Sequence, residues 1–180
     1  MRFYSTNSPE TTVSIQQALF HSLPADNGLY MPDSIPNLGS EFFKQIAHDS
    51  LADIGYQISK ALFGSEIVDA DLQELTHHAF LFETPVVALE EGKMSVLELF
   101  HGPSLAFKDV GARYMAGLMS YFSKQGDAEV HILVATSGDT GGAVAMGFHN
   151  VPGVRVSILY PSGRVSDLQE KQLTTLGGNI

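Results

Sequence analysis

One lysine of this chain stands where its amine could act as a nucleophile. Lys108 follows an apolar, strand-like run and precedes a helical pattern, within His101-Gly102-Pro103-Ser104-Leu105-Ala106-Phe107-Lys108-Asp109. A cation in the first turn of a helix is disfavoured by the helix dipole, and the apolar neighbours predict a partly desolvated amine. Desolvation favours the neutral amine, which can form a Schiff base. A surface lysine at a helix start is the alternative, and composition alone favours it.

A glycine-rich turn further along the chain could bind an anion. The stretch Ala135-Thr136-Ser137-Gly138-Asp139-Thr140-Gly141-Gly142 follows an apolar run and precedes a helix of small residues. Free backbone N–H groups at a helix N-terminus attract anions, and the hydroxyls add donors. The pattern is neither a Walker loop nor the dinucleotide fingerprint. Asp139 opposes a bare phosphate, so a ligand with a carboxylate or an ammonium fits better. The alternative is a structural turn in which Ser137 or Asp139 caps the helix.

A fixed amine beside an anion-binding turn is what an enzyme that uses pyridoxal 5'-phosphate (PLP) requires. A metal site is not indicated. His77 and His78 are adjacent on a predicted helix and point apart. Neither they nor His101 have a carboxylate at the spacing that metal-binding helices use. We expect solvated histidines and no metal.

The composition excludes several classes of function. The chain has 180 residues, with 20 Asp and Glu against 10 Lys and Arg, which argues against nucleic-acid binding. It has no cysteine, so disulfides, thiolate nucleophiles and cysteine metal sites are excluded. No apolar run approaches the roughly 20 residues that span a bilayer. The amino-terminal residues lack the apolar core of a secretory signal, so the expected location is cytoplasmic.

Residues 1–90 are expected to form one mostly helical unit. Apolar residues recur at helical spacing in four segments, and Thr11, Thr12 or Ser14 could cap the first. The predicted helices cover 13–23, 41–48, 51–63 and 70–80, with an extended segment at 29–32.

After residue 85 the pattern changes to strands and helices. The predicted strands cover 86–89, 95–100, 130–135 and 154–159, and the predicted helices cover 110–123, 142–149 and 166–176. Ser166 is the expected N-cap of the last helix, with Glu170 near the capping-box position. The alternation from about residue 95 predicts a parallel sheet covered by helices on both faces. Ligands bind at the carboxyl ends of such strands, so both marked turns are candidates to face one crevice.

Residues 178–180 resemble the start of a further strand. The two or three strands that would then be present are too few for a doubly wound domain. We therefore expect the chain to be the amino-terminal part of a longer protein.

Together these motifs resemble those of the threonine synthase family, PLP enzymes of fold type II, the fold of the tryptophan synthase β subunit. The stretch 101–109 is similar to the PLP-lysine motif, with Ser104 where Thr is also common, and 135–141 to the substrate-binding turn. Residues 27–32, 159–166, 169–172 and 177–180 also match. The resemblance covers the whole chain and implies an α/β fold. Residues 1–90 would be a mostly helical amino-terminal domain, and residues 91–180 the first part of the PLP-binding αβα domain.

The resemblance also implies a chemistry. Lys108 would form the Schiff base with PLP, and Phe107 would pack near the cofactor ring. The turn Thr136-Ser137-Gly138-Asp139-Thr140 would hold the carboxylate end of the substrate. O-phospho-L-homoserine and water would become L-threonine and phosphate, with Lys108 moving protons from Cα and then from Cβ. The loop for the PLP phosphate and the hydroxyl residue that faces the pyridine nitrogen would lie beyond residue 180.

Two alternatives stay open. Another enzyme of the same fold, such as a threonine dehydratase or an O-acetylserine sulfhydrylase, is opposed by the His-Gly-Pro run and by the helical amino-terminal domain. A non-catalytic threonine-synthase-like fragment is opposed by the intact Lys108 motif. The expected partner is the small-molecule substrate, with no nucleic acid and no membrane, and an oligomer is compatible with these expectations.

Overall fold

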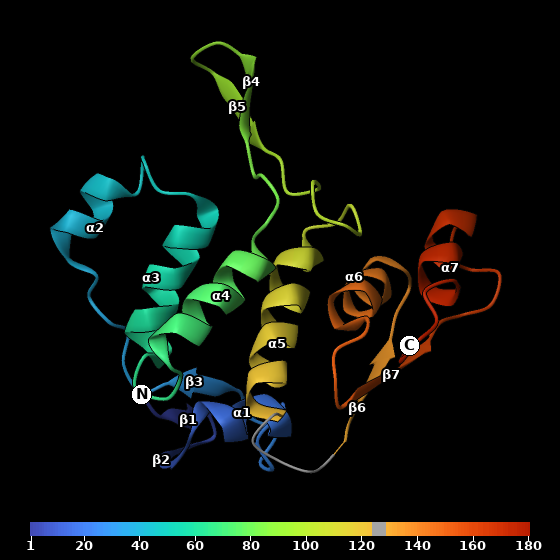
Figure 1. The fold of residues 1–180 in the computed structure, drawn as a ribbon, viewed down its shortest axis with the longest axis horizontal. Coiled ribbons are helices and arrows are strands. Elements are labelled where there is room, and N and C mark those ends of the chain that lie inside the picture. Colours follow the sequence, from blue (N-terminus) through green and yellow to red (C-terminus); the bar gives the residue numbers. More distant parts are fainter. Residues whose placement is uncertain (124–128) are drawn as a thin grey trace. The chain divides into compact units, whose positions relative to one another are not determined.

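The computed structural model describes residues 1–123 and 129–180, which form two compact units (Figure 1). Unit 1 is Met1–His77 and unit 2 is His78–Ile180. Both contain helices and short strands, so the predicted mixture of α and β structure is confirmed. Among the described residues, no helix combines the length and the apolar character that crossing a bilayer requires.

Unit 1 begins with a three-stranded antiparallel sheet that the sequence predicted only in part. The strand order is β2 (Ser8–Val13), β1 (Phe3–Ser5) and β3 (Tyr30–Pro32). Only β3 coincides with a predicted extended segment. β1 is three residues long, and β2 is polar and mostly exposed. Neither strand therefore shows the alternating apolar pattern of a half-buried strand.

Four helices follow in the predicted order, and only the last residues of the fourth lie beyond unit 1. They are α1 (Ile15–His21), α2 (Gly39–Gln45), α3 (Leu51–Phe63) and α4 (Asp69–Ala79). Ser14, one of the three predicted caps of α1, forms a reciprocal capping box with Gln17. Leu72 and Leu75 of α4 are buried. These helices form where an apolar stripe at helical spacing can pack into a core.

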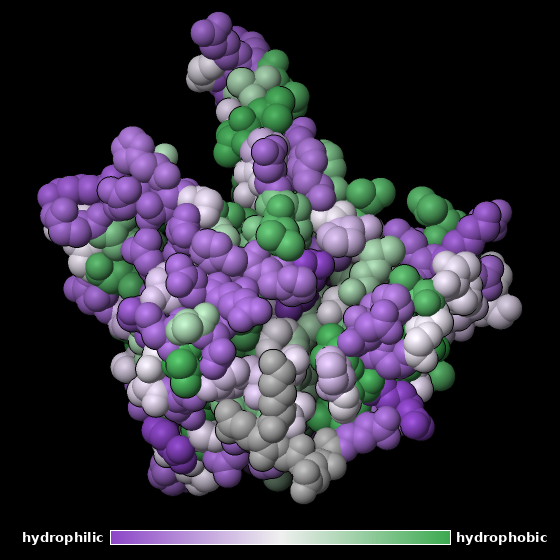
Figure 2. Space-filling view, viewed as in Figure 1, coloured by the Kyte–Doolittle hydropathy of each residue, from purple (hydrophilic) through white to green (hydrophobic). Residues whose placement is uncertain are grey.

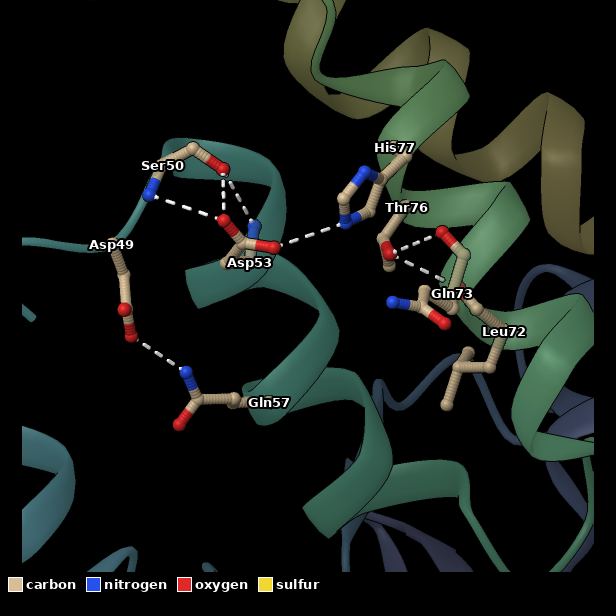
Figure 3. A network of polar contacts seen from close by, with 8 residues as sticks. All are labelled: Asp49, Ser50, Asp53, Gln57, Leu72, Gln73, Thr76 and His77. Atoms are coloured by element: carbon tan, nitrogen blue, oxygen red, sulfur yellow. Dashed lines mark hydrogen bonds and ion pairs between the residues drawn. The ribbon is translucent and has the colours of Figure 1, made fainter.

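A polar network joins the start of α3 to α4 within unit 1 (Figure 3). Ser50 and Asp53 form a capping box, and Asp53 Oδ1 lies 3.1 Å from His77 Nε2. The hydrogen bond from Ser50 is the main cause that holds the pKa of Asp53 below its usual range. His77 is thus paired with a carboxylate, while 44% of its side-chain surface remains accessible.

Unit 2 contains an antiparallel hairpin of β4 (Val86–Glu90) and β5 (Met94–Leu97). Gly92, with φ +70°, turns the chain back between the two strands. β5 therefore pairs with β4 and not with the parallel strands, which corrects the prediction of a parallel pattern from residue 95. The hairpin extends away from the helices of unit 2 (Figure 1), and hydrophobic side chains lie on its surface (Figure 2).

The rest of unit 2 is built around a β-α-β crossover. β6 (Val130–Ala135) and β7 (Val154–Leu159) pair in parallel, and α6 (Asp139–Phe148) connects them. α5 (Lys108–Ser123) and α7 (Asp167–Thr174) both pack against α6. At Gly147 the helix α6 comes close to the backbone of Ala112, and an added Cβ there would be tight.

One face of the parallel strands is covered and the other is open. Val154 and Val156 are buried, whereas Leu133 and Leu159 are 66% and 56% exposed. The predicted cover on both faces is therefore not found in the part of the chain that the structure describes. The reason is that α6 packs on the strands, while no described element buries Leu133 and Leu159.

Residues 178–180 form a turn and an irregular end, not the further strand that we predicted. Asn179 ties them to unit 2, because its amide nitrogen donates to the carbonyls of Phe148 and Val154, each at 2.9 Å. Its Oδ1 accepts a hydrogen bond from the N–H of Asn150 at 2.7 Å. Its backbone carbonyl accepts from Val156 N, so the segment lies beside β7 without forming a strand.

Candidate active site

Lys108 is the first residue of α5, and its side chain is exposed. The loop before it also exposes Leu105 and Phe107, with 63% and 60% of their surface accessible. The predicted partial desolvation of the amine is therefore not provided by the described residues, because these apolar neighbours are themselves exposed. The amine is open to an incoming carbonyl compound.

Asp109, which follows the lysine, is fully buried and shapes the loop. Its Oδ2 accepts a hydrogen bond from the backbone N–H of Ser104 at 2.8 Å. Gly102 permits this arrangement, because a Cβ at that position would overlap the Asp109 carboxylate. Leu105 has φ +58°, a left-handed conformation that costs energy in a residue with a side chain. Sequence reasoning gave Asp109 no role, because a carboxylate beside a lysine has no pattern of its own.

Two polar atoms beside Lys108 remain unused. Asp109 Oδ1 and Ser104 Oγ are buried and have no hydrogen-bond partner within residues 1–123 and 129–180. Buried polar atoms are normally paired, directly or through water. The first turn of α5 and its loop thus retain hydrogen-bonding capacity next to the lysine.

The glycine-rich turn is organised by Thr136. Its Oγ1 accepts hydrogen bonds from two backbone N–H groups of the turn, each at 3.0 Å. Gly138, with φ +145°, occupies the N-cap position of α6. The cap by Ser137 or Asp139 that the structural alternative named is therefore wrong, because Gly138 occupies that position. Ser137, Asp139 and Thr140 are exposed, so their polar groups are accessible to a ligand.

Helix α7 contacts both predicted site segments. Gln169 Nε2 donates to Asp139 Oδ1 at 2.7 Å, and Gln172 Nε2 donates to the carbonyl of Ser104 at 3.5 Å. Residues three apart lie on one face of a helix. One face of α7 therefore brings the segments 101–109 and 135–142 into the same neighbourhood.

Neither glutamine was singled out from the sequence. We placed Glu170 near the capping box of α7, but Gln169 closes the box with Ser166. The Ser-x-x-Gln spacing from Ser166 could have identified Gln169 as the capping partner. No sequence signal predicts its second contact, with Asp139.

Other titratable groups near these segments form local pairs. His101 stacks on Phe100, and its Nε2 lies 2.7 Å from a carboxylate oxygen of Glu98. Tyr160 donates a hydrogen bond to Glu170, which raises the pKa of the Tyr160 hydroxyl. Within the described ranges, no three His, Asp or Glu side chains are arranged to hold a metal ion.

Comparison with known proteins finds relatives over the whole chain. The family model described as the threonine synthase N terminus matches residues 2–80. The curated threonine synthases of Haemophilus influenzae and Escherichia coli are each 42% identical over 180 residues, which is 100% of this chain and 41% of theirs. The chain therefore spans about two-fifths of the length of these relatives.

Solved structures give the same result. The crystal structure of threonine synthase from Escherichia coli has a TM-score of 0.89 at 42% identity, covering 100% of this chain and 41% of that one. PLP-bound threonine synthase from Brucella melitensis has a TM-score of 0.89 at 34% identity, covering 96% and 38%. The resemblance to threonine synthases that the motifs indicated is confirmed.

Proposed function

We propose that this chain, whose whole length matches the amino-terminal part of threonine synthases, serves the conversion of O-phospho-L-homoserine and water to L-threonine and phosphate. One observation carries the proposal. Lys108, whose side chain is exposed, is the first residue of α5. It lies in a chain that is 42% identical, over all of its 180 residues, to part of a curated threonine synthase. Residues 1–90 would be the amino-terminal domain of that enzyme, and residues 91–180 the first part of its PLP-binding αβα domain.

The surroundings of Lys108 fit PLP as the cofactor. An amine that attaches to the cofactor aldehyde must be accessible, and Lys108 is exposed. Phe107 is 60% exposed and offers an aromatic ring for stacking on the cofactor. Ser104 Oγ and Asp109 Oδ1 add hydrogen-bonding capacity that no described residue uses. When bound, PLP supplies an electron sink for negative charge on the substrate.

Lys108 has two tasks in this proposal. It would hold the cofactor through its amine, and the same amine, once free, would take a proton from Cα of the substrate and then one from Cβ. Phosphate would leave from Cγ with the C–O electron pair, water would give its hydroxyl to Cβ, and one proton each would be returned to Cγ and Cα. Because Asp109 anchors the first turn of α5 to the loop, the amine keeps a fixed starting point for these transfers.

The turn 136–140 would bind the carboxylate of the substrate. Ser137 and Thr140 offer exposed hydroxyls, and the first turn of α6 offers backbone N–H groups. Thr136 fixes the conformation of the turn through its two accepted hydrogen bonds.

Further expectations remain predictions. They concern a cytoplasmic location, an oligomer, and a phosphate-binding loop and a pyridine partner beyond residue 180. The described chain divides into its compact units between His77 and His78, earlier than the predicted domain boundary at residue 90.

Trapping the cofactor on its lysine tests the proposal. The protein expressed from its complete reading frame is incubated with stoichiometric PLP, reduced with borohydride, digested and analysed by mass spectrometry. We expect a pyridoxyl group on Lys108 and none on Lys60. A folded protein that carries no label at Lys108 would overturn the proposal. Labelling of the complete protein but not of residues 1–180 alone would show that cofactor binding needs the remaining chain.

The substrate is tested separately. Phosphate release from phosphohomoserine is measured beside keto-acid release from threonine. Threonine synthase activity predicts the first product and little of the second. Keto acid without phosphate release would indicate a dehydratase of the same fold.

A further inference from the structure

The carboxylate of Asp139 is a difficulty for the proposed substrate turn. It lies in the first turn of α6, between the exposed hydroxyls of Ser137 and Thr140. Like charges repel, so a free Asp139 would weaken the binding of a substrate carboxylate at this turn. A contact that fixes the direction of the Asp139 carboxylate would reduce its repulsion of the substrate carboxylate.

Gln169 of α7 makes such a contact, because both the nitrogen and the oxygen of its side-chain amide are hydrogen-bonded. Its Nε2 donates to Asp139 Oδ1 at 2.7 Å. Its Oε1 accepts from the backbone N–H of Ser166 at 3.3 Å and from the Ser166 hydroxyl at 3.1 Å. The cap of α7 therefore sets the orientation of the amide, and the amide holds one oxygen of Asp139.

The turn is shaped to receive this side chain. A Cβ on Gly138 would overlap the amide group of Gln169, so the glycine makes room for it. The same face of α7 carries Gln172, which contacts the carbonyl of Ser104, and the buried Leu173, which lies against Gly141. Residues 169, 172 and 173 are at positions i, i+3 and i+4 and therefore lie on one face of α7. Their contacts hold this face of α7 against the segments 101–109 and 135–142.

We propose that Gln169 is a positioning residue for the substrate. By holding Asp139 toward α7, it leaves the hydroxyls of Ser137 and Thr140 free to receive the carboxylate of the amino-acid substrate. This inference rests on the proposed function, because it needs a substrate carboxylate at the turn. It adds a residue outside both motifs and assigns Asp139 a fixed direction.

Replacing the neutral amide by a carboxylate of the same length tests the inference. In the protein from the complete reading frame, Gln169→Glu places two carboxylates side by side. We expect KM for phosphohomoserine to rise by about tenfold at pH 8, with kcat and the PLP absorbance changing less than about twofold. As the pH falls, the two carboxylates share a proton, so the increase in KM becomes smaller. A role limited to packing would not produce this pH dependence.

Two further variants complete the test. Gln169→Met keeps the length without the amide, and we expect a rise in KM of about threefold that does not change with pH. Gln73→Glu, the same substitution at an exposed position of α4, adds the same charge and should leave KM unchanged.

The outcomes separate this inference from the function on which it rests. If both Gln169 variants bind phosphohomoserine like the wild type, or lose the same factor at every pH, Gln169 has no positioning role. If Gln169→Glu does not fold, an unchanged KM in Gln169→Met overturns the inference, and so does a loss shared by KM, kcat and PLP absorbance. A raised KM with kcat and PLP absorbance unchanged supports it. A wild-type protein that neither takes up PLP nor consumes phosphohomoserine overturns the proposed function, and this inference with it.

Discussion

Two lysines, one in each unit, show how the surroundings decide what an amine can do. In unit 1, Lys60 Nζ lies 2.8 Å from Asp69 Oδ1 and donates to Tyr56 Oη at 3.1 Å. The hydrogen bond with Asp69 is the main cause that raises the pKa of Lys60 to about 12. In unit 2, the ammonium of Lys108 takes part in no ion pair or hydrogen bond with any residue that the structure describes. The first lysine is held in a structural pair, and the second is held by none of the described residues.

Removing each amine gives the largest difference between the two units. Lys108→Ala in the protein from the complete reading frame should lower kcat by at least about a thousandfold, because the attachment point and the base are lost together. Lys60→Ala should leave kcat within about twofold, since the amine serves only a surface pair. Phosphate release measures both. A Lys108→Ala protein that still makes threonine at the normal rate would contradict the assignment of Lys108 as the lysine that binds PLP.

The glycines around Lys108 allow a comparison within unit 2. Gly102→Ala places a Cβ against the buried Asp109 carboxylate, and we expect the free energy of unfolding to fall by about 1–3 kcal/mol. Gly111, in α5 itself, is exposed and has open space where an added methyl group would lie. Gly111→Ala should therefore stabilise the protein by about 0.5–1 kcal/mol. Urea titration measures both. Equal effects of the two substitutions would mean that the loop does not depend on close contact with Asp109.

The sequence predicted the elements whose own pattern specifies them. The helix predicted at 51–63 is α3, with the same bounds, because its apolar stripe and its Ser50 cap are both local signals. The strands β6 and β7 were likewise predicted from apolar, β-branched runs. β1 and β2 were missed, because short polar strands are stabilised by their partners and not by their own composition.

The sequence predicted only some of the residues of the candidate site. The motif around Lys108 and the turn at 136–140 were found because each has a recognisable order of residues. The roles of Asp109 and Gln169 were not found, because they depend on contacts that the fold creates. Asp109 meets the N–H of Ser104, and Gln169 meets a carboxylate thirty positions earlier. Exposure of Lys108 was missed for the same reason, since apolar neighbours in sequence need not cover a side chain in space.

Two capping boxes, closed by Asp53 in α3 and by Gln169 in α7, offer a finer comparison. Ser50 caps α3 in unit 1 and Ser166 caps α7 in unit 2, each accepting from the backbone N–H of the third residue of its helix. Ser50→Ala and Ser166→Ala should each lower the free energy of unfolding by about 1 kcal/mol. Only Ser166→Ala should also raise KM for phosphohomoserine, by about twofold, because Gln169 loses the hydroxyl that orients its amide. Urea titration and steady-state kinetics measure the two effects. A KM raised equally by both substitutions would contradict a specific role for the α7 cap.

The smallest effect is expected at the ion pair of unit 1. The hydrogen bond with Lys60 is the main cause that lowers the pKa of Asp69, so the stabilisation is present above the ordinary pKa of 3.8 and is lost as the pH falls through the lower folded value. For Lys60 the sign is reversed, because its stabilisation is present below 10.5 and is lost as the pH rises through about 12. Both side chains are more than half exposed, so salt should screen the pair.

Asp69→Asn is the variant that isolates this pair. We expect a slightly lower urea midpoint than in the wild type at pH 6, and a difference that shrinks as the pH falls through the lowered pKa of Asp69, because the wild-type carboxylate then becomes neutral as well. High salt should reduce the difference at pH 6, and kcat should stay unchanged throughout. A difference that grew on acidification would mean that Asp69 is destabilising when charged. The hydrogen bond with Tyr56, and not the Asp69 carboxylate, would then hold the Lys60 amine. The two lysines would then differ only in whether a hydroxyl partner is present.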